Sequence, residues 1–504
     1  MPLKTFFALD RQSNSPQLPV EIWSYIFSYS AVDSPILTHA ISQTCTLWRN
    51  IALSTPRLWT QMVVLGYGTS YRDVFPNHTL INLWITRSRS KLLDIVFYGR
   101  GSDDGQRVLD KLLGELARWR TAVIHASDLN NARIAKLHRG TANGAPLLES
   151  LKLYTDFLQH TEVPSILWSK SPRLRNLRLQ YRFVEDRGHG GALIPGWLTT
   201  CHIPFHQLTV FTVNCDLAMP MYELQIGAMD VVSLLRAYPN LVVCRLDAIH
   251  HHEPRLHVLS TQPTVLPNLK VLELSLSSQV PFSGRSIPLL SILRQFVAPS
   301  LQTLILGGER NWDSASFRQF IEDSGCSLQS IVLEQSTLTD QQFEDCLLVN
   351  PSLKKVLRNP QTAPALQHVN PVLSRDTISR LAKWDPESKR FALCPELEDL
   401  SFPFSCLSQD DDAPFARMIE ARLTLGSQGE DSKARPAFKT LQLFDYDCSS
   451  SLPLPVAELK LLWTLRERYG LDIVFVDLRD DKIRFEDVLD WDALLDRDGF
   501  RSPG

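Results

Sequence analysis

Pro-Asn-Leu-Lys-Val-Leu-Glu-Leu, residues 267–274, is one of the four clearest copies of a pattern that recurs through most of this 504-residue chain. Leu272 and Leu274 flank one charged residue, an alternation typical of a short strand with one buried face. The proline ends the preceding helix and launches the strand. The segment therefore predicts one short strand whose leucines need a second layer to cover them.

The same spacing, Leu-x-x-Leu-x-Leu with other apolar residues allowed, occurs in eleven further copies. Successive copies start roughly 25 to 34 residues apart as far as Leu328, a period typical of solenoids. Those copies are Trp59/Met62/Val64, Leu92/Ile95/Phe97, Trp119/Ala122/Ile124, Leu148/Leu151/Leu153, Leu174/Leu177/Leu179, Leu208/Phe211/Val213, Leu241/Cys244/Leu246, Leu301/Leu304/Leu306, Leu328/Ile331/Leu333, Leu397/Leu400/Phe402 and Phe438/Leu441/Leu443.

Helical patterns fill the intervals between these copies. A short strand followed by a helix, repeated, can bury its leucines only by stacking on neighbouring repeats. The predicted helices span residues 80–87, 108–116, 231–237, 287–297, 316–324, 340–348, 413–423 and 456–469.

This pattern resembles a leucine-rich repeat array. The resemblance implies an α/β solenoid with a parallel concave sheet and outer helices. The asparagine or cysteine expected after the last leucine is mostly absent, and residues 360–386 and 427–435 interrupt the period, so we expect an irregular arc. The alternative is an ordinary α/β domain, whose buried strands also read as apolar runs. A dozen copies without a phosphate-binding glycine-rich turn favour the solenoid.

The N-terminal region has a different, all-helical pattern. Residues 18–27 read Leu-Pro-Val-Glu-Ile-Trp-Ser-Tyr-Ile-Phe, and Pro19 suits the first turn of a helix. Trp23 and Phe27 form an apolar edge beside one helix face, which carries Ile22, Tyr25, Ile26 and Tyr29. Residues 30–35 predict a turn. A second helix is expected to carry one stripe, Ile41, Cys45, Trp48 and Ala52, and to stop at Pro56.

These two pieces resemble an F-box of the fungal type, with Leu18-Pro19, the run from Trp48 to Ala52 and the following Pro-Arg-Leu-Trp at 56–59 as the matching residues. The resemblance implies contact with a Skp-type adaptor and, through it, a cullin ubiquitin ligase. The residues expected to form or support that contact are Leu18, Pro19, Ile22, Ile26, Phe27, Trp48, Ile51 and Trp59. The alternative is that the helices merely cap the array.

The open face of the predicted sheet is the candidate surface for a protein target. Within each copy the leucines point inward, so the residues between and after them alternate to the open face. Arg and Tyr are frequent binding hot spots, although most such positions are ordinarily just solvated. The candidate residues are Lys152, Tyr154, Arg178, Gln180, Asn214, Arg245, Asp247, Glu273 and Glu334.

Composition and charge argue against a nucleic-acid-binding, membrane-spanning or secreted protein. The net charge of −3 gives no global field for nucleic acid, and no apolar run reaches the eighteen residues of a membrane span. Nine scattered cysteines without a Cys-x-x-Cys pair, and no secretory signal, predict a cytoplasmic or nuclear protein. The histidine cluster at 250–252 and 257 predicts a solvated loop, and the glycines at 188–191 a mobile one, so we expect no metal, cofactor or catalytic residue.

The domain organisation follows. We expect a flexible N-terminus at 1–14, the F-box at 15–60, the solenoid at 61–476 and an acidic tail at 477–504. Residues 477–498 hold nine acidic and four basic residues, with an apolar face that could cap the last repeat; the alternative is an exposed acidic peptide. The expected function is substrate recognition for a Skp–cullin–F-box ubiquitin ligase, without enzyme activity. The alternative is a leucine-rich-repeat-like scaffold that recruits no ligase.

Overall fold

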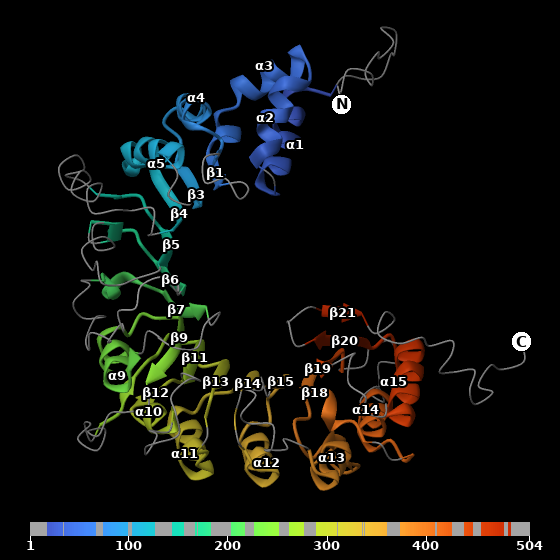
Figure 1. Ribbon diagram of the computed structural model, residues 1–504. Helices are drawn as coiled ribbons and strands as arrows, with labels where there is room; N and C mark the ends of the chain where they lie inside the picture. Colours follow the sequence, from blue (N-terminus) through green and yellow to red (C-terminus); the bar gives the residue numbers. More distant parts are fainter. Residues whose placement is uncertain are drawn as a thin grey trace, which may run out of the picture. The chain divides into compact units, whose positions relative to one another are not determined.

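The computed structural model divides into two compact units, Met1–Leu174 and Arg175–Gly504, which are described separately (Figure 1). The residues that the structure describes are 18–33, 35–66, 74–98, 103–125, 144–155, 167–168, 170–182, 203–216, 226–250, 262–276, 289–309, 311–334, 336, 338–359, 373–408, 411–425, 438–446, 455–477 and 482–484.

The first unit begins with three helices, α1 (Val20–Asp33), α2 (Pro35–Thr44) and α3 (Thr46–Ser54), followed by the 3-10 turn η1 (Pro56–Trp59). The sequence predicted two helices, with a turn over residues 30–35. That expectation was wrong in two respects, because α1 runs on to Asp33 and the second helix is split at Cys45. Cys45 is extended (φ −151°) and its sulfur accepts the Trp48 amide at 3.5 Å, so it caps α3.

A four-stranded parallel sheet follows in the same unit, formed by β1 (Gln61–Gly66), β3 (Leu93–Tyr98), β4 (Trp119–His125) and β5 (Ser150–Thr155). The short strand β2 (Val74–Phe75) pairs antiparallel to the end of β1. Between the strands lie α4 (His78–Ser88), α5 (Asp103–Gly114) and the turn η2 (Leu116–Arg118). Asn77 caps α4 by accepting the amides of Thr79 and Leu80.

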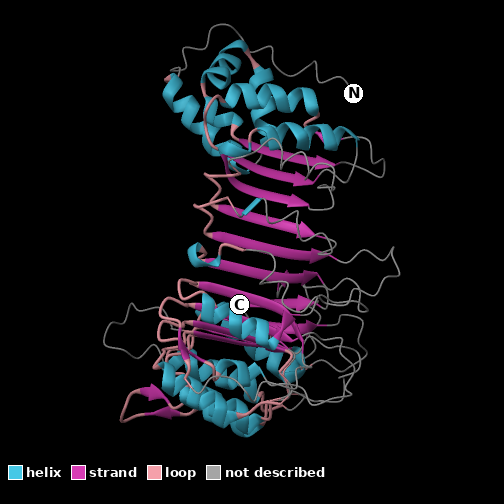
Figure 2. Ribbon diagram, turned by 90° about the vertical axis from the view of Figure 1, so that its left-hand side faces the viewer, coloured by secondary structure: helices cyan, strands magenta, loops and turns pink. Residues whose placement is uncertain are grey.

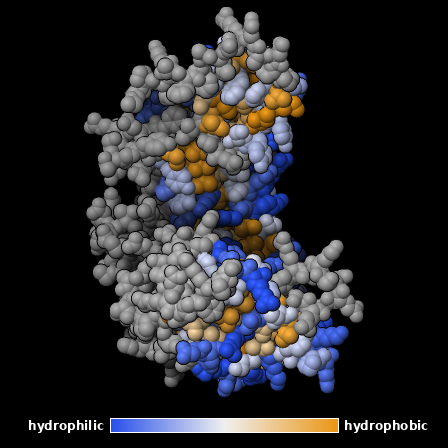
Figure 3. All heavy atoms as spheres, turned by 90° about the vertical axis from the view of Figure 1, so that its right-hand side faces the viewer, coloured by the Kyte–Doolittle hydropathy of each residue, from blue (hydrophilic) through white to orange (hydrophobic). Residues whose placement is uncertain are grey.

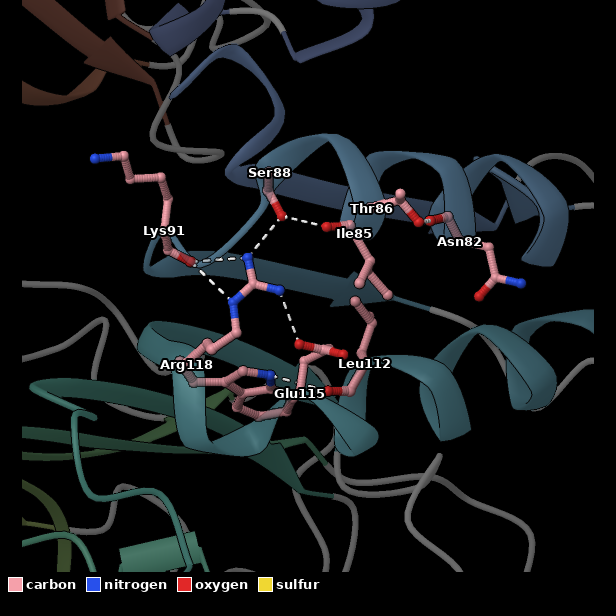
Figure 4. A network of polar contacts seen from close by, with 9 residues as sticks. Asn82, Ile85, Thr86, Ser88, Lys91, Leu112, Glu115 and Arg118 are labelled. Carbon is pink, nitrogen blue, oxygen red and sulfur yellow. Dashed lines mark hydrogen bonds and ion pairs between the residues drawn. The ribbon is translucent and has the colours of Figure 1, made fainter. Parts of the chain in front are cut away.

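Arg118 ties these first two strand–helix repeats together (Figure 4). Its Nη1 donates to Glu115 at 2.8 Å, and its Nη2 donates to the Ser88 hydroxyl at 2.7 Å. Its Nε and Nη2 also donate to the Lys91 carbonyl, just past the end of α4. One guanidinium thereby joins the end of α4 to η2, using the fork of donors that arginine holds in fixed geometry.

In the described part of the second unit, ten strands follow one another in a parallel sheet, and each of them pairs with the next (Figure 2). They are β6 (Asn176–Arg182), β7 (Val210–Asp216), β9 (Val243–His250), β11 (Val271–Leu276), β13 (Thr303–Gly307), β14 (Ser330–Glu334), β15 (Lys355–Asn359), β18 (Asp399–Pro403), β19 (Thr440–Tyr446) and β20 (Asp472–Asp477). Short β8 (Ile226–Gly227) adds to β9, and β10 (Thr264–Val265) pairs with β12 (Phe296–Val297).

Eight strands of this unit begin at a carbonyl of the preceding repeat that accepts two successive amides. The Lys270 carbonyl, for example, accepts both the Gln302 amide at 2.9 Å and the Thr303 amide at 3.0 Å. The same double acceptance occurs at eight carbonyls among the described residues: Arg175, Thr209, Val242, Lys270, Gln302, Gln329, Lys354 and Glu398. Each repeat therefore sets the register of the next through its backbone alone.

Helices flank this sheet on one side in Figure 1. They are α9 (Ala228–Ala237), α10 (Leu289–Leu293), α11 (Ser314–Ser324), α12 (Asp340–Val349), α13 (Arg375–Ala382), α14 (Pro414–Leu425) and α15 (Val456–Tyr469), with 3-10 turns η4 (Phe205–Gln207) and η7 (Phe404–Cys406). All twelve predicted copies coincide with parallel strands. Every apolar residue of those copies is buried except Leu92, which is half-buried.

Several elements lay outside the sequence prediction. β15 was missed because Arg358 stands where the pattern expects the last leucine. Helix α13 and the hairpin of β16 (Trp384–Asp385) with β17 (Arg390–Phe391) fall in or beside the stretch read as an interruption. The helix predicted over 287–297 is shorter, since it ends at Leu293 and β12 follows it.

Part of the predicted tail pairs with the sheet. β21 (Lys482–Arg484) lies antiparallel to β20, with Phe475 opposite Ile483. The rest of the tail, the N-terminus 1–14, the loops at 188–191 and 427–435, and histidines 251, 252 and 257 lie outside the described residues.

Candidate functional site

Three aromatic rings form the centre of the N-terminal helical module. The ring centroids of Trp23, Phe27 and Trp48 lie 5.0 to 5.5 Å apart, joining α1 to α3. Ile51 and Ala52 of α3 are buried as well. The separations are those of favourable edge and tilted aromatic contacts, so the two helices are held together by ring packing.

Trp59 joins the module to the first repeat of its own unit. Its indole is fully buried and donates to the Ala52 carbonyl at 2.8 Å. The ring lies 6.1 Å from Trp84 of α4, and the Arg87 guanidinium lies 4.4 Å from its centroid. Trp59 is thus a structural link between α3 and α4.

The module also exposes apolar side chains, and those of α1 follow one face of that helix. Along α1, Ile22 and Ile26 are 45% and 38% exposed, and Tyr25 and Tyr29 are 72% and 73% exposed. Of thirteen large hydrophobic side chains exposed in the described part of the chain, nine lie between residues 18 and 53: Leu18, Val20, Ile22, Tyr25, Ile26, Tyr29, Leu37, Leu47 and Leu53. Figure 3 shows apolar surface at the top of its view, where Figure 1 places α1 to α3.

The predicted adaptor residues therefore separate into two groups. Leu18, Pro19, Ile22 and Ile26 lie on the exposed face. Phe27, Ile51 and Trp59 are buried, and Trp48 is half-buried against Trp23 and Phe27. The second group can only support the surface that the first group presents. The most exposed residues of this face, Tyr25 and Tyr29, were on the predicted helix face but not among the predicted contacts.

The open face of the first unit's sheet carries a cluster of aromatic residues. His125 stacks on Tyr154 with ring centroids 4.6 Å apart, and Tyr98 lies 4.7 Å from His125. Lys152 Nζ lies 4.6 Å from the centroid of Tyr154. Burial and a hydrogen bond with Tyr154 raise the pKa of Tyr98 above its ordinary value. The structure thus brings two predicted target residues, Lys152 and Tyr154, beside two that were missed.

The other predicted residues lie on the open face of the second unit. Arg178, Thr212, Arg245 and Glu273 are successive partners across β6, β7, β9 and β11. Arg245 Nε lies 3.4 Å from Glu273 Oε2, while burial raises the pKa of Glu273 against the attraction of that charge. Gln180 pairs in register with Asn214, Glu334 lies two strands from β11, and Asp247 is half-buried on β9.

The same register row becomes apolar further along the sheet. Glu273 is followed by Ile305, Val332 and Leu357 on β13, β14 and β15. Val332 is 8% exposed, and the other two are half-buried. Sequence reasoning missed this apolar patch. Its signal was present, because Leu-Ile-Leu at 304–306 and Ile-Val-Leu at 331–333 are continuous apolar runs where the pattern expects alternation.

Other kinds of site find little support in the described residues. No group of three or more histidine, cysteine or carboxylate side chains there converges as metal ligands would. Within the same part of the chain, no helix combines the length and the apolar character that crossing a membrane requires.

Comparison with known proteins assigns the N-terminal module. Residues 15–64 match the family described as F-box-like, so this module is an F-box-like domain, followed by the leucine-rich-repeat-like array described above. No curated protein matches the chain. A chain of the solved structure entitled "Crystal structure of Rad7 and Elc1 complex in yeast" is similar over 84% of this chain and 88% of that one, at 12% identity and a TM-score of 0.32.

Proposed function

We propose that this protein is the substrate-recognition subunit of a Skp–cullin–F-box ubiquitin ligase. In this proposal the exposed face of α1 binds a Skp-type adaptor, and the open face of the repeat array binds a protein target. The observation that carries the proposal is the gathering of exposed apolar side chains within the F-box-like domain.

The argument for an adaptor rests on the energetics of that surface. Exposed apolar area is unfavourable in water, and contiguous patches of it are characteristic of protein-binding sites. Ile22, Tyr25, Ile26 and Tyr29 follow one helix face at i, i+3, i+4 and i+7, the spacing with which a helix enters an apolar groove. Phe27 and Trp48 fix that face from behind through their ring contact.

The argument for a target rests on the array. The cluster of Tyr98, His125 and Tyr154 offers aromatic surface, and aromatic residues are enriched at binding hot spots. A ligase held at the F-box would act on lysines of a bound target through raised effective concentration, without a catalytic residue in this chain.

The second candidate function is a scaffold that binds its partner through the array and recruits no ligase. The observation that favours it is structural, because Trp59 joins the helical module to α4 through buried contacts. A module so attached could serve as the N-terminal cap that a repeat array requires.

Co-purification with a Skp-type adaptor separates the two functions. The test variant is Ile22→Ala with Ile26→Ala, and the matched control is Leu83→Ala, which changes a comparably exposed leucine (40%) on α4. Each truncated isoleucine removes about 2 kcal/mol of apolar burial if it contacts the adaptor, which weakens binding roughly 30-fold. We expect adaptor binding by the wild type and the control, and its loss from the variant.

Circular dichroism must show that the variant keeps its helices and strands. A folded wild-type chain that does not bind the adaptor, or a double variant that binds as well as the control, would contradict the ligase function and favour the scaffold.

A further inference from the structure

A small pocket lies beside the β16–β17 hairpin in the second unit. Its volume is about 110 Å³, and its walls come from the hairpin, the segments that precede β18 and β19, and helix α14. The lining side chains are Trp384, Lys389, Arg390, Phe391, Pro395, Leu397, Arg422 and Phe438. Three of these carry a positive charge and three are aromatic, whereas none is acidic.

Arg422 is the most unusual of these residues, because its guanidinium is buried without a carboxylate. It is 3% exposed, and its nitrogens donate to three main-chain carbonyls, those of Leu381, Leu393 and Cys394, at 2.6 to 3.1 Å. Burial lowers the pKa of Arg422 to about 10, so the group remains charged at neutral pH. Three bonds use three of its five N–H donors, which leaves two for another acceptor.

Two further cations line the same pocket, and no carboxylate does. Lys389 and Arg390 follow each other on the hairpin, and both are exposed. The hairpin carboxylate Asp385 does not line the pocket, and its two oxygens accept the Glu387 amide at 3.0 Å and the Ser388 hydroxyl at 2.7 Å. Glu387 and Glu396 are exposed and also lie outside the lining.

The aromatic walls determine what else the ligand must carry. Trp384 and Phe391 meet edge to face with ring centroids 5.0 Å apart, and Arg422 lies 4.5 Å from the centroid of Phe391. An apolar cavity of about 150 Å³ can hold benzene, so a pocket of about 110 Å³ encloses one oxyanion head with an edge of a ring, and the rest of such a ligand lies outside it. A bare ion would leave the rings unused, and a neutral ring would leave the cations unpaired.

We propose that this pocket binds an oxyanion borne on a flat apolar group, such as an aryl carboxylate or an aryl phosphate. The oxyanion lies among Lys389, Arg390 and Arg422, and the apolar group contacts Trp384, Phe391 and Phe438. Charge-assisted hydrogen bonds from arginine to carboxylate or phosphate are the strongest that side chains form. The proposal does not depend on the F-box, because every lining residue belongs to the second unit.

Titration calorimetry of the full-length protein with small probes tests the proposal. The probes are benzoate and phenyl phosphate, with inorganic phosphate, benzyl alcohol and benzylamine as references. We expect saturable binding of benzoate or phenyl phosphate, at least about fivefold tighter than any reference probe. Whichever of the two binds more tightly identifies the source as carboxylate or phosphate. Binding should weaken as salt is raised from 50 to 500 mM, because exposed charges are screened.

Two variants locate the site without removing buried structure. Lys389 has φ +50°, a conformation that glycine adopts without strain, so Lys389→Gly removes a cation while the turn is kept. Arg390→Ala removes the second exposed cation. We expect each to weaken binding about threefold to fivefold, the range of a partly exposed ion pair. The matched control, Arg417→Ala, removes an exposed arginine of α14 that does not line the pocket.

The calorimetry of these variants either supports or overturns the proposed site. Loss of affinity in both pocket variants, with an unchanged Arg417→Ala protein, supports the site. The proposal is overturned if neither aryl anion binds saturably, if benzylamine or benzyl alcohol binds equally well, or if Lys389→Gly and Arg390→Ala bind like the wild type.

Discussion

Arg358 and Arg422 are two buried arginines with different degrees of hydrogen bonding. Both are 3% exposed, and burial lowers the pKa of each. Arg422 donates to three carbonyls. Arg358 donates through Nη2 to the Leu338 carbonyl at 2.9 Å, while its Nε and Nη1 have no acceptor within the described part of the chain. A buried charge that lacks partners costs free energy, whereas one that is well bonded supports the groups around it.

The two arginines should therefore respond differently to replacement by methionine. Arg358→Met should leave the free energy of unfolding unchanged or raise it by about 1 kcal/mol, because the variant removes a buried charge whose Nε and Nη1 have no acceptor in the described part of the chain. Arg422→Met should lower it by about 3 kcal/mol, because three buried carbonyls lose their donors. Urea unfolding followed by circular dichroism measures both. A marked loss of stability in Arg358→Met would contradict this expectation and would show that the charge is compensated, as by Asp340 or the ring of Phe343.

For the predicted adaptor residues, the sequence did not distinguish exposed side chains from buried ones. The helical period placed Ile22 and Ile26 on one face of the helix, and in the structure both are exposed on α1. The F-box resemblance placed Phe27, Ile51 and Trp59 in the same set, although they are interior. A motif records which residues occur together, and it does not distinguish a contact residue from the core residue that positions it.

At the scale of elements, the first amides of α14 are bound by a side chain from another helix. Glu458 of α15 is fully buried and accepts the Phe415 amide at 3.0 Å and the Ala416 amide at 2.6 Å, at the start of α14. A third amide, that of Ser408, lies 3.4 Å from the same carboxylate. The first amides of a helix have no partner within it, so Glu458 supplies an N-terminal cap across two repeats.

Removal of this cap should loosen the last repeats. Glu458→Ala leaves the amides of Phe415 and Ala416 buried without an acceptor, and we expect a loss of about 2–4 kcal/mol in the free energy of unfolding. Glu467→Ala is the control, since Glu467 lies on the same helix and is exposed, and it should change stability by less than about 0.5 kcal/mol. Equal stability of the two variants in thermal and urea unfolding would refute the capping role.

The elements that the sequence predicted share one property, which is a regular period. The strands follow from the leucine pattern because their inward residues are buried, as at Leu272 and Leu274. β15 was missed because Arg358 breaks that pattern. The junction of α2 and α3 was missed because cysteine is not one of the residues that usually indicate the start of a helix. The aromatic cluster depends on the pairing register of β3, β4 and β5. The sequence of one strand does not determine how it pairs with its neighbours, so the cluster could not be predicted.

At the scale of the whole molecule, the array is stabilised by contacts between neighbouring repeats. Each strand of the second unit pairs with the strands before and after it, and long-range contacts of other kinds are few in such architectures. Stability is therefore expected to be local, with a defect felt most in adjacent repeats.

Hydrogen exchange can show this locality. Leu304 of β13 is fully buried, and Leu304→Ala should cost about 2–5 kcal/mol. We expect faster amide exchange in β11, β13 and β14, with β1, β3 and β4 of the first unit unchanged. The reciprocal variant Leu151→Ala should speed exchange in β4 and β5 and leave β13 and β14 as in the wild type. Uniform acceleration through both units in either variant would show a single cooperative structure instead.

The shared carbonyls at the strand starts give the array a natural unit of length. One repeat runs from Lys270, which carries one shared carbonyl, to Leu301, the residue before Gln302, which carries the next. If those residues were excised together, the Val242 carbonyl would face the amides of Gln302 and Thr303 in place of those of Lys270 and Val271. A protein built in this way can gain or lose whole repeats by duplication or deletion of a gene segment. Its binding surface then becomes longer or shorter while the backbone hydrogen bonds between repeats stay the same.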